Sequence, residues 1–335
     1  MVTIKDIAEV CGVSVATVSR ALNGLANPEN QHTMDILRKA QEMGYYPNSA
    51  ARTLKTSRSN NIGIIYEDRM DHEFFSLLLN EVRFAAEDQG YDLTFIRRSS
   101  HYEAGTYQDR ARRRNLDGVV VVQTDFTSAD VMQLADSGFP TVVIDHVYEG
   151  CDCVMNDNLS AMEEIVRAVQ RIGHREIAFI HGEDGNVTRE RIAGFIQSCR
   201  EIGIAADHDS LVSGHFHDPD SCGEAVRGLL AAGRKPTCIL CPDDFSCLGA
   251  LSALQEMNIR VPEEISLIGF DGTRFSRMVS PRLATYRQNT EMIARTAVQL
   301  LGDAIDHPQE HIPQRVALAG TFIPGETLGP AYIRA

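Results

Sequence analysis

Long apolar runs are missing from this 335-residue sequence. None reaches the roughly 18 residues that a membrane-spanning helix needs, so no membrane partner is expected. The first ten residues include Lys5, Asp6 and Glu9, and they lack the continuous apolar stretch of a secretory signal peptide. We therefore expect a cytoplasmic protein and not a secreted or periplasmic one.

Motifs of nucleotide binding and of nucleophilic catalysis are missing as well. No G-x-G-x-x-G follows the first strand-like run at residues 62–66, and the sequence contains neither a P-loop nor a nucleophile elbow. No Ser/His/Asp set has a spacing that would assemble a triad. The sequence therefore predicts no catalytic residues, no cofactor and no enzyme.

Metal ligands are also scarce, although the sequence has eight cysteines. Without an export signal these are expected to be reduced thiols. Cys238 and Cys241 form a C-x-x-C within a strand-like run, where residues three apart point to opposite faces. Two further pairs lack a third ligand: Cys151 with Cys153, and His215 with His217. No metal site is predicted.

The net charge of −14 looks unfavourable for binding nucleic acid, but it is unevenly distributed. Residues 1–60 contain seven Lys/Arg and five Asp/Glu, a charge of +2, so the remainder carries −16. A mildly basic end on an acidic body is typical of a protein that meets DNA through that end only.

Three segments follow from the residue pattern. Residues 1–46 are helical and compact, residues 47–60 are small and polar like a linker, and residues 61–335 alternate strand-like apolar runs with amphipathic stretches. Several of these stretches end in a glycine, as helices often do: Gly90, Gly173 and Gly203. Such alternation predicts parallel sheets covered by helices on both faces, and about ten such units require two lobes.

The first 46 residues predict a helix-turn-helix. Thr3 and Asp6 form a capping box, Gly12 allows a tight turn, and Ser14 caps a second helix. A third helix is expected at residues 28–43, with Asn27 as its cap. By geometry alone, a three-helix bundle without any role in DNA binding remains open.

The order of residues resembles a known signature. Residues 2–24, VTIKDIAEVCGVSVATVSRALNG, and residues 44–55, GYYPNSAARTLK, closely resemble the N-terminus of the LacI/GalR family of bacterial transcription regulators. The resemblance implies a second helix in the major groove, with Val15 and Ala16 offering methyl groups to thymine and Arg20 reading guanine. Hydroxyl side chains would position phosphates: Ser14, Thr17 and Ser19.

The family resemblance also implies a hinge helix at residues 48–55, starting at Asn48. Leu54 would wedge into the minor groove with Lys55 beside it. So short a helix should form only on DNA and beside its symmetry mate, while an ordinary flexible linker is the alternative. Residues 27–33 depart from the family pattern, which leaves the usual backbone contacts of that region unassigned.

The body resembles the same family, most clearly at residues 171–182, 189–195, 236–250 and 260–272. This implies an α/β core of two Rossmann-like lobes, as in periplasmic binding proteins. The first lobe would comprise residues 61–157 and 289–318, and the second residues 158–288 and 319–335. The family's effector cleft falls on six positions here: Phe74, Phe75, Arg191, Phe216, Asp243 and Asp271.

Each of these residues has a second interpretation. Arg191 could pair with Glu190 or Glu183 at the surface, at least one of the two neighbouring phenylalanines is expected in the core, and Asp271 could cap a turn. Asp243 stands where relatives commonly have Asn. Aspartates, an arginine and aromatic rings together suit a polyol that donates hydroxyl hydrogens.

These observations predict a homodimeric repressor, associated with the nucleoid, that binds a near-palindromic operator. A sugar or sugar derivative bound between the lobes would change its operator affinity by linkage. A purine- or nucleoside-responsive corepressor-type regulator is one alternative, and a carbohydrate-binding protein without a DNA role is another. The sequence does not determine whether the ligand induces or corepresses.

Overall fold

The computed structural model describes residues 2–22, 26–45, 58–67, 72–96, 105–206 and 210–332. Two compact units divide the chain, Met1–Ser59 and Asn60–Ala335, which we call the headpiece and the body. Most of the expected hinge lies at residues 46–57, so Asn48, Leu54 and Lys55 fall outside the described residues. Within the described ranges no helix is long and apolar enough to cross a membrane.

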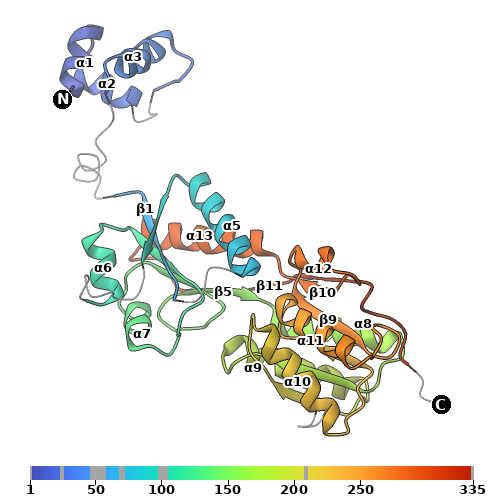
Figure 1. Cartoon of the computed structure of the whole chain (residues 1–335). Coiled ribbons are helices and arrows are strands. Elements are labelled where there is room, and N and C mark those ends of the chain that lie inside the picture. Colours follow the sequence, from blue (N-terminus) through green and yellow to red (C-terminus); the bar gives the residue numbers. More distant parts are fainter. Residues whose placement is uncertain are drawn as a thin grey trace. The chain divides into compact units, whose positions relative to one another are not determined.

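The headpiece contains α1 (Ile4–Cys11), α2 (Val15–Leu22) and α3 (Gln31–Glu42) (Figure 1). The predicted capping box is confirmed, because the Thr3 side chain accepts from the Asp6 amide and the Asp6 side chain accepts from the Thr3 amide. Gly12 turns the chain with a φ of 64°, in the left-handed region. A small core closes the three helices: Ile7, Ala8, Val18, Ala21, Ile36 and Ala40.

The predicted start of the third helix is wrong. Asn27 does accept a hydrogen bond with its side chain, but from the Glu29 amide in a turn, and the helix begins only at Gln31. Asn30 is the actual cap, with its side chain accepting from the His32 amide. Asn27 and Asn30 are both residues that can cap a helix, and in the structure Asn30 does so.

The body contains two six-stranded sheets. The first has the order β11-β5-β4-β3-β1-β2 and the second β12-β10-β9-β8-β6-β7. The first-lobe strands are β1 (Asn61–Ile65), β2 (Asp92–Ile96), β3 (Gly118–Val121), β4 (Thr141–Ile144), β5 (Asp152–Asn156) and β11 (Arg315–Leu318). The second-lobe strands are β6 (Ile177–His181), β7 (Leu211–Ser213), β8 (Cys238–Leu240), β9 (Ser266–Asp271), β10 (Ala284–Arg287) and β12 (Thr321–Ile323).

The first sheet is wholly parallel, as the alternation predicts, but the second is mixed. Its edge strand β12 runs antiparallel to β10. The reason is topological: the chain returns to the second lobe directly from β11, without a crossover helix that would reverse its direction.

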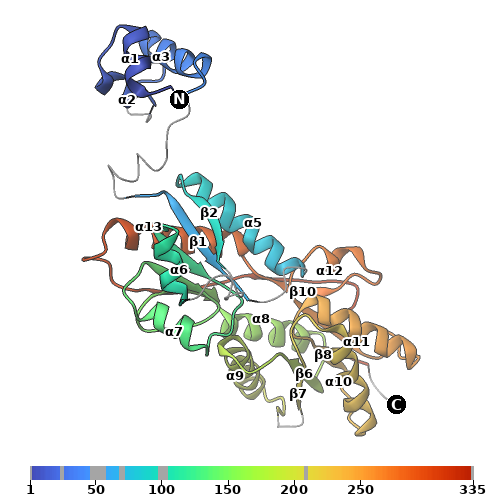
Figure 2. The same cartoon turned by 60° about the vertical axis from the view of Figure 1, so that its left-hand side comes forward.

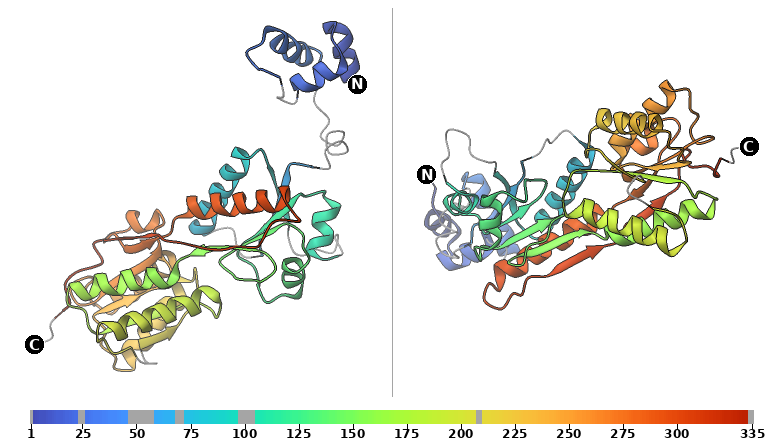
Figure 3. Two further views of the ribbon diagram at one scale, coloured as in Figure 1. Left: turned by 180° about the vertical axis from the view of Figure 1, so that it is seen from behind. Right: turned by 90° about the horizontal axis from the view of Figure 1, so that it is seen from below.

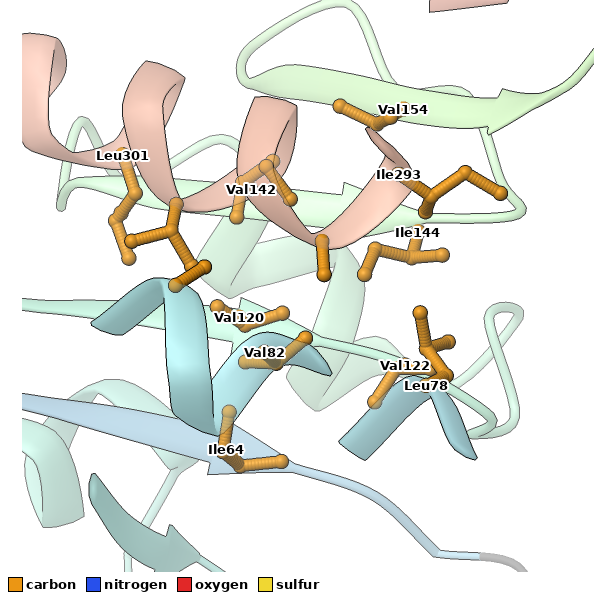
Figure 4. Packing of buried hydrophobic residues seen from close by; sticks show 14 of the residues in the cluster. Ile64, Leu78, Val82, Val120, Val122, Val142, Ile144, Val154, Ile293 and Leu301 are labelled. Atoms are coloured by element: carbon orange, nitrogen blue, oxygen red, sulfur yellow. The ribbon is translucent and has the colours of Figure 1, made fainter. Parts of the chain in front are cut away.

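Helices cover both faces of each sheet (Figure 2). On the first sheet, α5 (Glu73–Asp88) and α13 (Thr290–Asp306) pack on one face, and α6 (Tyr107–Arg113) and α7 (Ala129–Ala135) on the other. On the second sheet the pairs are α8 (Asn158–Arg171) with α9 (Asn186–Glu201), and α10 (Pro219–Ala231) with α11 (Asp244–Glu256), while α12 (Phe275–Met278) is a single turn. In Figure 4, Val120 and Val142 of the first sheet meet Val82 of α5 and Leu301 of α13.

The polypeptide crosses between the lobes three times: from β5 to α8, from β10 to α13 and from β11 to β12 (Figure 3). Each lobe is therefore built from segments far apart in sequence.

Cys238 and Cys241 confirm the expectation for the C-x-x-C. Cys238 belongs to the core on the α8–α9 face of the second sheet and Cys241 to the core on the α10–α11 face. All eight cysteines are free thiols.

Candidate functional site

A cavity of about 460 Å³ opens between the two lobes of the body. Its wall forms where strands of both sheets end: after β1, β3 and β4 in the first lobe, and after β6, β7, β9 and β10 in the second. Carboxyl ends of parallel strands are the usual place for ligands in α/β folds. The wall includes Glu67, Phe74, Gln123, Thr124, Asp125, Phe126, Asp145, Glu183, Asp184, Gly185, Asn186, Val187, Thr188, Arg191, Phe216, His217, Asp271 and Gln288.

Arg191 of α9 is the buried cation of this wall, with only 4% of its surface exposed. Its Nε donates to Asn158 Oδ1 at 2.9 Å and its Nη1 to the carbonyl of Pro242 at 2.8 Å. The guanidinium carbon lies 3.5 Å from the centre of the Phe270 ring, a cation–π contact. Burial lowers the pKa of Arg191, while the facing Asp271 and Asp145 oppose that shift.

Two carboxylates face the guanidinium, one from each lobe. Burial raises the pKa of Asp145 to about 6 and that of Asp271 to about 6, although the charge of Arg191 counteracts both shifts. Both residues adopt positive φ angles, 67° for Asp145 and 98° for Asp271, which are unfavourable for most side chains. Backbone strain of this kind is concentrated at binding and active sites.

Three polar atoms in the cavity wall are buried without a hydrogen-bond partner: Thr124 Oγ1, Thr188 Oγ1 and Gln288 Oε1. The amide nitrogen of Gln288 donates to Asp271 Oδ1 at 2.7 Å, which leaves its oxygen as the free acceptor. Native structures satisfy almost all buried polar groups, so clustered exceptions indicate a place for a polar ligand.

In the headpiece, the N-terminal half of α2 presents an exposed face. Val15, Ala16 and Arg20 are exposed, while Val18 and Ala21 on the opposite side are buried in the headpiece core. Ser14 Oγ accepts from the Thr17 amide at 3.1 Å and so caps the helix. Ser19 is half-buried.

Comparison with known proteins finds a family match in each of the two units. Residues 3–48 match the pattern described as bacterial regulatory proteins of the lacI family, and residues 166–328 match a periplasmic binding protein-like domain. The HTH-type transcriptional repressor PurR of Pasteurella multocida is 30% identical over 92% of this chain and 94% of its own length. The chain belongs to the LacI family of bacterial transcription regulators.

Another relative is the probable HTH-type transcriptional repressor ExuR of Bacillus subtilis, 30% identical over 92% of this chain and 93% of its own length. Solved structures agree in fold. A lac repressor dimer bound to operator and an anti-inducer has a TM-score of 0.79 at 23% identity, covering 97% of this chain and 98% of that one. A CelR–cellobiose complex has a TM-score of 0.72 at 24% identity, covering 98% and 100%.

As a LacI-family member the chain is a DNA-binding transcriptional repressor with an effector-binding domain, and it is not an enzyme. The expected architecture, a helix-turn-helix headpiece plus a two-lobed α/β body like that of periplasmic binding proteins, is confirmed.

The structure brings four of the six predicted effector residues of this LacI-family body into one wall: Phe74, Arg191, Phe216 and Asp271. Both phenylalanines belong to the first-lobe core, at 6% and 1% exposed, and of the two only Phe74 also reaches the cavity wall. Arg191 does not pair with Glu190 or Glu183, the surface alternative, because its donors turn inward to Asn158 and Pro242.

Asp243 is not among the residues of the cavity wall. It caps α11 by accepting from the Ser246 amide at 2.8 Å, and its other oxygen accepts from the His217 amide at 2.8 Å. The sequence signal was present, since an aspartate directly before a helix with serine at its third position is a capping pattern.

Asp145, Thr188 and Gln288 line the cavity but were not predicted as site residues. Asp145 follows a buried strand, as Asp271 ends one, and that shared pattern could have identified it. Thr188 and Gln288 carry no such signal. Only the folding of α9 and of the second interlobe crossing places them in the wall.

Proposed function

We propose that two copies of this chain bind a near-palindromic operator and that a small effector in the interlobe cavity changes operator affinity. One helix-turn-helix reads only a few base pairs, so a two-fold dimer is the arrangement that supplies enough specificity. The observation that carries the effector half of this proposal is the cavity wall, which combines unpartnered polar atoms with two strained carboxylates around Arg191.

On the DNA side, α2 enters the major groove with its exposed face. Val15 and Ala16 contact thymine methyl groups, and Arg20 donates to a guanine edge. Ser14, Thr17 and Ser19 contact phosphates. Asn48, Leu54 and Lys55 form the hinge that enters the minor groove when DNA is bound. The dimer acts at the chromosome, within the nucleoid.

In the body, effector and DNA are linked thermodynamically. If the ligand prefers one arrangement of the dimer, reciprocity requires DNA to change ligand affinity by the same factor. A sugar is the leading effector class, since solved proteins of the same fold contain cellobiose or ribose and the cavity offers aromatic faces beside polar groups. A purine or nucleoside is the second candidate, favoured by Phe74, Phe126 and Phe216, which could stack on a base.

The DNA half is tested by selecting duplexes from a random pool with the purified chain and measuring binding by fluorescence anisotropy. Enrichment of a palindrome is expected. Recovery of no preferred sequence, with or without candidate ligands, would overturn the proposal.

Replacing Arg20 by alanine should weaken binding to the selected operator by about 1–3 kcal/mol and leave binding to random duplex nearly unchanged, because the lost contacts are to a base edge. Lys39→Ala, which removes a cation paired with Glu42 on α3, is the charge-matched control and should lower both affinities alike. Equal losses on both duplexes for the Arg20 variant would assign it to the phosphates.

A further inference from the structure

The cavity wall is strongly acidic. It contains Glu67, Asp125 and Asp145 from the first lobe, and Glu183, Asp184 and Asp271 from the second. Arg191 is its only Lys or Arg among the described residues.

Arg191 is held in a fixed position by its neighbours. Its Nε and Nη1 are held by Asn158 and Pro242, and its plane rests on Phe270. Two of its five N–H donors are thereby occupied, and the others remain for an oxygen of a ligand. Its charge is already offset by the two facing aspartates.

Besides Arg191, the N-terminus of α9 attracts negative charge in the described part of the wall. Its cap, Gly185, provides no side-chain hydrogen bond, and a helix N-terminus is equivalent to roughly half a positive charge. Glu183 and Asp184 directly precede that terminus. Asp184 is paired with Arg189 at the surface, so Glu183 is the carboxylate that offsets the partial positive charge of this terminus.

The unsatisfied atoms of the described wall can all accept hydrogen bonds. Asp145 has no hydrogen bond from its carboxylate to any described residue, and Gln288 presents only its oxygen. Thr188, 3% exposed, has a free hydroxyl that can donate or accept. A matching ligand must donate hydrogens to several of these atoms, as hydroxyl and ammonium groups do.

We propose, building on the proposed function that this cavity holds the effector, that the effector is a hydroxyl-rich molecule of zero or positive charge. Neutral sugars and amino sugars belong to this class. Sugar acids and sugar phosphates are excluded. A uronic acid nearly keeps the shape of its parent sugar, so for that pair charge makes the distinction.

The test uses matched sets on the full-length dimer, followed by thermal shift and calorimetry. Each set contains a neutral aldose, its 2-amino derivative, its uronic acid and its phosphate, for glucose, galactose and mannose, with ribose and ribose 5-phosphate added. Hypoxanthine and adenosine complete the panel. The neutral or amino member of one set should bind on the order of 100-fold more tightly than its acid and phosphate, as expected for a like charge about 6 Å away at an effective dielectric constant of about 20.

Two variants identify the source of the discrimination. Asp145→Asn should reduce the ratio of the affinities for the neutral sugar and for its acid by about tenfold. The substitution removes one charge and keeps the shape of the side chain. Glu256→Gln is the control: Glu256 is 59% exposed, paired with Arg227 and not among the residues of the cavity wall, so the ratio of the two affinities should not change.

The possible results distinguish a failure of the proposed ligand class from a failure of the proposed regulatory function. Tighter binding of an acid or phosphate, binding of the purine compounds alone, or no binding by any member refutes the ligand class. Operator affinity is measured on the same preparations. A neutral sugar that binds without altering operator affinity supports the ligand class but refutes the regulatory proposal.

Discussion

Replacing Asp145 by asparagine should stabilise the effector-free body at neutral pH. The side chain stands at the end of β4 with a φ of 67°, a conformation that asparagine tolerates well. The substitution keeps the size of the side chain and removes a charge that burial makes unfavourable. Stability and ligand binding therefore oppose each other at this position.

The magnitude follows from the pKa of Asp145. Burial raises it from 3.8 to about 6, and each unit corresponds to about 1.4 kcal/mol, so the ionised group destabilises the folded state by up to about 3 kcal/mol. Between these two values the folded state retains a proton that the unfolded chain has lost. Stability thus falls as pH rises through this window, and the full deficit is present above pH 6 to 7.

Calorimetry of the effector-free protein at several pH values tests this. The Asp145→Asn body should unfold several degrees higher at pH 7.5, at roughly 2–4 °C per kcal/mol, and the free-energy gain should shrink to about half at pH 5. Asp184→Asn, at an exposed carboxylate, should change little at either pH. A destabilised variant at pH 7.5, or a gain independent of pH, would refute the view that a buried ionised carboxylate is maintained here for binding.

Two further predictions concern the site and the fold. Arg191→Ala should abolish the effector response, with at least about tenfold weaker ligand binding and unchanged operator binding, because it removes the cation between two buried carboxylates; a retained response in a reporter assay would exclude Arg191 from the site. Gly249→Ala should destabilise the body by about 1–3 kcal/mol or more in urea unfolding, since its new Cβ would lie 1.7 Å from the Pro219 carbonyl oxygen. Gly228→Ala, with nothing within 4 Å, is the control and should be neutral or stabilising; equal effects from the two would contradict the close packing of α10 on α11.

The sequence pattern predicts the ends of helices well where they depend on residues close together in the chain. The capping box at Thr3 is present, and Gly90, Gly173 and Gly203 all have positive φ angles after their helices. The third headpiece helix shows the limit of such reasoning. Asn27 and Asn30 are both good caps, and the pattern alone does not rank them.

The residues of the interlobe cavity could not be predicted from the sequence pattern alone. Family resemblance located Arg191, Phe216 and Asp271, but it could not decide which of Phe74 and Phe75 faces the cavity, because that depends on how α5 rotates against the first sheet. Asp243 has the residue type of a site residue, and its side chain is nevertheless used to cap a helix.

The sequence by itself determined the headpiece, the alternation of strands and helices, and the division of the body into two lobes, because these depend on periodicity and caps within a few residues of each other. Only the tertiary structure decided the chemistry of the cavity. Asp145 and Asp271 lie far apart in the chain and belong to different lobes. Their placement around one fixed guanidinium, Asp145 half-buried and Asp271 buried, arises only when the strand ends of both lobes meet.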